Sequence, residues 1–124
     1  MGSWGYGVFD SDGALDFIGD IVDKYCEAID ESFKTIEDES SFNSENEDIL
    51  VLVRLLDVIC NESGAAFPDV KLVECWKEKY TPLFEKYAPA NWLHTEDMVN
   101  RRKVIQDTFN SLIKDTKEFW KEAD

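Results

Sequence analysis

Apolar residues recur every three or four positions over residues 12–37, the spacing of one face of an α-helix. This face comprises Leu15, Ile18, Val22, Tyr25, Ile29, Phe33 and Ile36. Residues 10–12 all have side chains that suit the N-cap of such a helix. Gly13 and Gly19 weaken it, each by up to ~1 kcal/mol relative to alanine. We therefore expect another segment to lie close against these glycines.

Residues 38–46 are polar and predict a loop, which a second helix over residues 47–61 should follow. This second segment has almost no polar face, which is typical of a helix at the centre of a bundle. Its β-branched content leaves a buried strand as the alternative, but a length of about 15 residues favours a helix. Gly64 is a candidate left-handed cap at its end.

A third helix is expected after Pro68, with an apolar face formed by Val70, Val73, Trp76 and Tyr80. Residues 81–82, Thr-Pro, resemble a cap followed by a proline at the first helical position. They predict a break or kink and a short continuation to Tyr87.

Residues 88–93 predict a loop, after which Thr95 is expected to cap a last helix that reaches about Lys121. The inner face of this helix comprises Met98, Arg102, Ile105, Phe109, Leu112, Thr116 and Phe119. Together the segments predict an all-α fold, a four-helix bundle-like array over residues 12–122 in one domain of residues 1–124. The glycine- and aromatic-rich leader, residues 1–10, is expected to pack on this array.

The excess of acidic residues limits the kinds of molecule that the protein is expected to bind. The chain has 124 residues, with 27 acidic and 13 basic side chains and a net charge of −14. Binding to nucleic acid or to an anionic membrane needs Lys and Arg at the phosphates, so neither is expected. No apolar run has the length of a membrane helix, and the N-terminus lacks the pattern of a signal peptide. A cytoplasmic location is therefore expected.

The negative charge is concentrated in one part of the chain. Residues 10–48 hold 14 acidic and two basic side chains. The acidic residues recur every three or four positions, so they form a stripe beside the apolar one, and like charges at this spacing repel. We interpret the stripe as a binding surface for a basic protein, formed by Asp16, Asp20, Asp23, Glu27, Asp30 and Glu31, with Glu37, Asp38 and Glu39 at its rim. The alternatives are a solvated face and weak binding of divalent metal ions.

Catalytic and metal-binding motifs are not apparent. Cys26, Cys60 and Cys75 are widely spaced and lie among apolar residues, which is typical of buried, reduced thiols. His94 is the one histidine, and it has no spacing signature with any cysteine. The sequence after Asp10 does not fit a calcium loop, because the glycine and the final glutamate are not at the required positions. No cofactor and no metal are expected.

The leader carries the most specific motif, Met-Gly-Ser-Trp-Gly-Tyr-Gly-Val-Phe-Asp-Ser-Asp-Gly-Ala-Leu-Asp over residues 1–16. It resembles an uncharacterised bacterial domain-of-unknown-function family with the N-terminal signature MGxWGxGxF(D/E)NDxALD. Ser11 and Gly13 depart from this signature. The resemblance implies a small, helical, cytoplasmic protein, and it implies no enzyme activity.

Small acidic bacterial proteins often neutralise basic toxin domains by covering their active sites. An immunity protein of this kind, without catalytic activity, is the function that the acidic stripe favours. A glycosidase-like use of paired carboxylates is disfavoured, because a stripe on one convex helix forms no cleft. The other alternative is a structural or regulatory domain, as a monomer or a homodimer, with an exposed aromatic patch formed by Tyr80, Phe84, Tyr87 and Trp92. The cluster at residues 101–103 is the only basic one, and salt bridges to acidic residues are expected for it.

Overall fold

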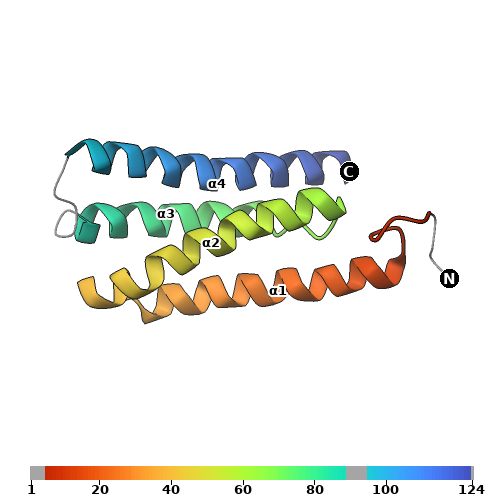
Figure 1. Cartoon of the computed structure of the whole chain (residues 1–124), viewed down its shortest axis with the longest axis horizontal. Coiled ribbons are helices and arrows are strands. Elements are labelled where there is room, and N and C mark those ends of the chain that lie inside the picture. The colour runs from red at the N-terminus through yellow and green to blue at the C-terminus, as the bar shows by residue number, and fades with distance from the viewer. Residues whose placement is uncertain (1–4, 89–94, 124) are drawn as a thin grey trace.

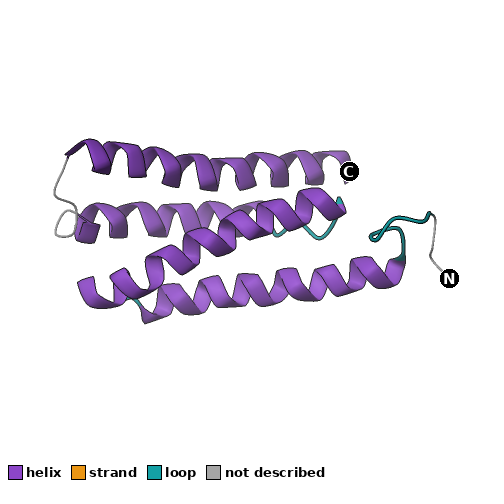
Figure 2. Ribbon diagram, in the orientation of Figure 1, coloured by secondary structure: helices purple, strands orange, loops and turns teal. Residues whose placement is uncertain are grey.

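The computed structural model describes residues 5–88 and 95–123. Four helices are found in these ranges: α1 (Asp12–Thr35), α2 (Glu39–Ser63), α3 (Val70–Tyr87) and α4 (Thr95–Ala123). Successive helices run in opposite directions, and the described ranges contain no strand (Figures 1 and 2). The predicted all-α, bundle-like fold is confirmed. None of the described helices combines the length and the apolar character that crossing a membrane requires.

Helix α2 lies at the centre of the array and contacts each of the other three helices. It runs obliquely, with α1 on one side and α4 on the other (Figure 1). The wholly buried residues Val53, Leu56 and Cys60 form its inner face. The prediction of a central helix here is confirmed, and the alternative of a buried strand is wrong.

The predicted loop over residues 38–46 is wrong, because α2 already begins at Glu39. The side chain of Asp38 accepts a hydrogen bond from the backbone N–H of Ser41, at 2.9 Å, and Ser41 Oγ accepts one from the backbone N–H of Asp38, at 3.0 Å. This capping box starts the helix at a polar sequence. Phe42, only 2% exposed, then anchors the first turns against the rings of Tyr80 and Tyr87.

At residues 81–82 a break or kink was predicted, with a continuation to Tyr87. The break is wrong, because α3 runs unbroken through Pro82, and the end at Tyr87 is confirmed. Proline cannot donate the usual backbone hydrogen bond. The lost bond would have reached the carbonyl of Glu78. Next to it, the Thr81 hydroxyl donates to the carbonyl of Lys77, at 3.0 Å. Pro82 lies on the exposed side of the helix, while Tyr80 and Phe84 are buried in the core on the other side. Burial of this face holds the helix together across the proline.

The predicted exposed aromatic patch is not formed by the described residues. Tyr80 and Phe84 are buried and Tyr87 is half-buried, while Trp92 lies outside the described residues. Aromatic residues at helical spacing have therefore entered the core, where Tyr80 also contacts Phe109 of α4, with ring centroids 5.5 Å apart.

The prediction that the leader packs on the helices holds only in part. Phe9 packs against the core, whereas Tyr6 and Val8 are exposed. Asp10 closes a turn, since its carboxylate accepts from the backbone N–H of Gly7 at 2.8 Å. A Cβ at Gly7 would approach this carboxylate to 2.7 Å, which explains the glycine. Trp4 lies outside the described residues. At the other end of the molecule, α4 begins at Thr95 itself, so its cap also lies outside them.

The two helical glycines that were expected to be covered are not. Nothing lies within 4 Å of a Cβ built on Gly13 or Gly19. Gly64, in contrast, has φ 70° and caps α2 in the left-handed conformation, as predicted. The two kinds of glycine therefore have different roles, one tolerated within a helix and one required at its end.

Replacing Gly19 by alanine is expected to raise the free energy of unfolding by about 0.5–1 kcal/mol, because alanine loses less backbone entropy on folding. Gly64→Ala is expected to lower it by about 1 kcal/mol, because a Cβ is strained in the left-handed conformation. Urea unfolding followed by circular dichroism measures both. Equal effects of the two substitutions would contradict these assignments.

Candidate functional site

The exposed carboxylates of α1 lie on one side of the helix, because they follow one another every three or four residues. We call this surface the acidic face; it comprises Asp16, Asp20, Asp23, Glu27 and Glu31, all of them exposed. The buried residues of the same helix, Ile18, Val22 and Ile29, occupy the side that packs on the core. The acidic face is thus directed outward.

The chain's own basic residues neutralise little of this charge. Within residues 5–88 and 95–123, one member of the face forms an ion pair: Glu31 lies 3.6 Å from Lys34. Both side chains of this pair are 74% exposed, so the pair contributes little to stability. The other four carboxylates have no Lys or Arg of the described ranges within ion-pair distance. Arg102 of the basic cluster pairs instead with Glu85 of α3, at 2.6 Å.

The remaining predicted site residues differ in their roles. Asp30 is half-buried, and its Oδ1 accepts a hydrogen bond from Trp76 Nε1 of α3 at 2.8 Å. Asp38 caps α2, and the hydrogen bond from the backbone of Ser41 lowers the pKa of its carboxyl. Glu37 and Glu39 are exposed near this cap. The structure therefore brings seven of the nine predicted carboxylates to the surface without such a role and gives two, Asp30 and Asp38, a structural one.

The cysteines are free, and two of them are poor nucleophiles. Burial raises the pKa of Cys26 to about 12, and the charges of Asp23, Asp30 and Glu27 add to this effect. Burial likewise raises the pKa of Cys60 to about 12. Few thiolates exist at neutral pH under these conditions. His94 lies outside the described residues. Within the described ranges, no three His, Cys, Asp or Glu side chains are grouped to hold a metal ion.

A second carboxylate cluster joins α2 to α4. Asp57 is only 3% exposed, and its Oδ2 accepts a hydrogen bond from the Ser111 hydroxyl at 2.6 Å. The amide of Asn61 donates to Asp57 Oδ1 at 2.8 Å and to Asp115 Oδ2 at 2.9 Å. Burial, followed by the hydrogen bond with Asp115, raises the pKa of Asp57, while the same hydrogen bond lowers the pKa of Asp115. The pKa values of the two neighbouring acids are therefore shifted in opposite directions.

This cluster is not predicted by the local sequence pattern. Its one signal was an acid, Asp57, within an otherwise apolar run of α2. A buried acid needs hydrogen-bond partners, but Ser111 and Asp115 are distant in the sequence. The amide of Asn61 bridges the two carboxylates, and neither Asp57 nor Asp115 lines the hollow between α3 and α4 or the hollow beside Asp30.

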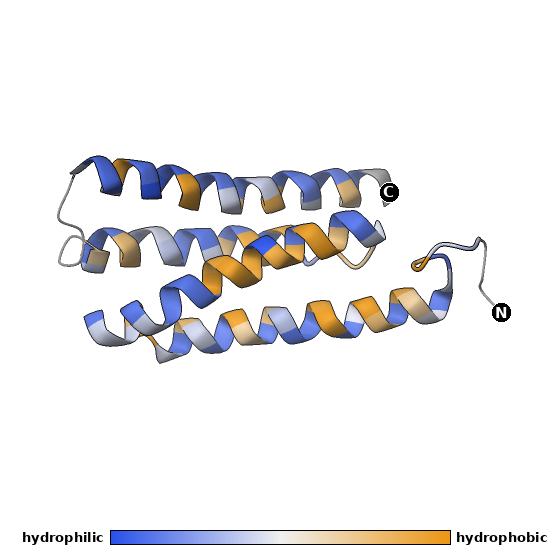
Figure 3. Cartoon of the chain, viewed as in Figure 1, coloured by the Kyte–Doolittle hydropathy of each residue, from blue (hydrophilic) through white to orange (hydrophobic). Residues whose placement is uncertain are grey.

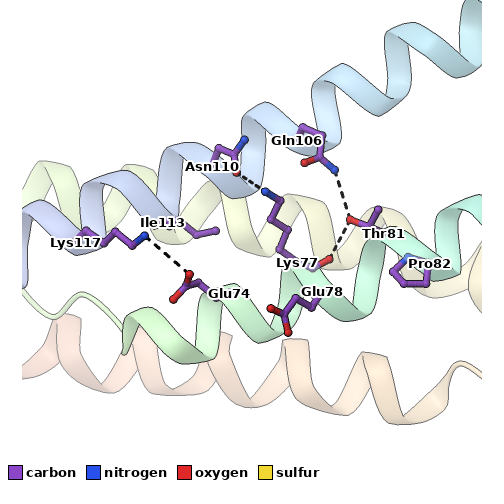
Figure 4. A pocket seen from close by; sticks show the side chains of 9 residues that line it. All are labelled: Glu74, Lys77, Glu78, Thr81, Pro82, Gln106, Asn110, Ile113 and Lys117. Carbon is purple, nitrogen blue, oxygen red and sulfur yellow. Dashed lines mark hydrogen bonds and ion pairs between the residues drawn. The ribbon is translucent and has the colours of Figure 1, made fainter.

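The hollow between α3 and α4, about 530 Å³ in volume, is lined mainly by polar side chains that bind one another (Figure 4). Lys77 Nζ donates to Asn110 Oδ1 at 2.8 Å, and Gln106 Nε2 donates to Thr81 Oγ1 at 3.4 Å. A second hollow, about 640 Å³, lies between α1 and α3 beside Asp30. The bonds in the first hollow join the two helices and leave few polar groups directed at a ligand.

The fold and the surface define an acidic, all-α helical protein in which five exposed carboxylates lie on one side of α1. The sequence model of a domain of unknown function, DUF4259, matches residues 2–124. The chain therefore belongs to the DUF4259 family. Comparison with curated proteins and with solved structures gave no match.

Proposed function

We propose that this chain is a cytoplasmic bacterial immunity protein that binds a basic toxin domain and covers its active site. The binding surface is the acidic face of α1, with Glu37 and Glu39 at its rim. The proposal assigns no catalytic residue to the chain.

The observation that carries the proposal is the set of carboxylates, Asp16, Asp20, Asp23 and Glu27, that lack ion pairs within the described ranges. Aligned like charges destabilise a helix, so the helix gains nothing from them. A surface of one sign steers a partner of the opposite sign and excludes partners of the same sign. The bare acidic face therefore favours a cationic protein partner over solubility alone, which dispersed charges would supply equally well.

The test uses a purified basic toxin domain encoded beside the gene of this chain. The triple variant Asp20→Lys, Asp23→Lys and Glu27→Lys is expected to lower the association rate constant by about 10- to 100-fold at low salt. The substituted residues are exposed, so circular dichroism should show an unchanged helix content. Stopped-flow binding at several salt concentrations measures the effect, and inhibition of the toxin measures its consequence.

A matched control separates this surface from net charge. The variant Asp97→Lys, Asp107→Lys and Glu118→Lys makes the same charge change at exposed positions of α4. It is expected to slow association by less than about threefold. An equal decrease of the association rate constant in the two triple variants would show that only total charge matters. Tight binding of the toxin domain by the first variant would exclude the acidic face as the interface.

A further inference from the structure

We draw no further inference here: the strongest candidate, the exposed apolar patch of Val51, Leu55 and Val58 on α2, whose middle is coloured hydrophobic in Figure 3, carries none because nothing in the structure shows what covers it.

Discussion

Replacing Trp76 by alanine is expected to lower the free energy of unfolding by about 3–5 kcal/mol. Trp76 is wholly buried on α3, and its indole N–H donates to Asp30 of α1. The substitution leaves a large cavity and removes a link between two helices. Urea unfolding followed by circular dichroism measures the loss. Small domains have about 5–15 kcal/mol in total, so this variant should be partly unfolded at moderate temperature.

The hydrogen bond can be separated from the packing of the ring. Asp30→Asn keeps an acceptor for the indole and should cost little, whereas Asp30→Ala leaves a buried donor unsatisfied and should cost about 1–3 kcal/mol. In the background of Trp76→Phe, the difference between the two substitutions should disappear. If Asp30→Ala and Asp30→Asn are equally stable, the bond contributes nothing. Asp30→Asn also allows the charge of Asp30 to be tested in binding without loss of the fold.

The second large effect is expected at Asp57. Asp57→Ala removes the acceptor for Ser111 and Asn61 and the partner of Asp115, and should cost about 2–3 kcal/mol. Asp57→Asn retains an acceptor and an N–H donor, so it resembles the protonated acid and should cost less than about 1 kcal/mol at neutral pH. Urea unfolding of the three proteins at one pH gives the comparison.

The opposite pKa shifts of Asp57 and Asp115 fix the sign of the pH dependence of stability. The folded pKa of Asp57 is raised, so its contribution is present at low pH and is lost as the pH rises through that pKa. The folded pKa of Asp115 is lowered, so its contribution is lost as the pH falls through that pKa. The pair therefore stabilises the folded protein most at a pH between the folded-state pKa of Asp115 and that of Asp57. Asp57→Asn should remove the loss of stability on the alkaline side, and parallel curves of stability against pH for this variant and the wild type would contradict the raised pKa of Asp57.

The sequence alone predicted the helices where periodicity and caps agree. Helix α1, the start of α3 and the left-handed Gly64 follow from local spacing and backbone preference. The start of α2 was missed because its first turns are polar, and only the reciprocal bonds of Asp38 and Ser41, with Phe42 in the core, make them helical. The break predicted at Pro82 is absent for a related reason, since burial of Tyr80 and Phe84 outweighs one lost hydrogen bond.

The candidate site was predictable to a similar degree. Spacing alone placed the carboxylates of the acidic face on one side of α1. It could not show that Asp30 binds Trp76, because 46 residues separate the two in the chain. The same limit applies to Asp57 and Ser111, which are 54 residues apart. Contacts of this kind depend on how the helices pack and not on any local pattern.

The order of the helices has a consequence for how the chain folds. Neighbours in the sequence pack on each other, α1 on α2 and α3 on α4, while the packing of α2 on α4 joins the two pairs. Each antiparallel pair closes a short loop, and such local contacts form quickly. Docking of the two hairpins is then the step that removes Asp57 from water, so refolding rates should depend on the protonation of this one acid.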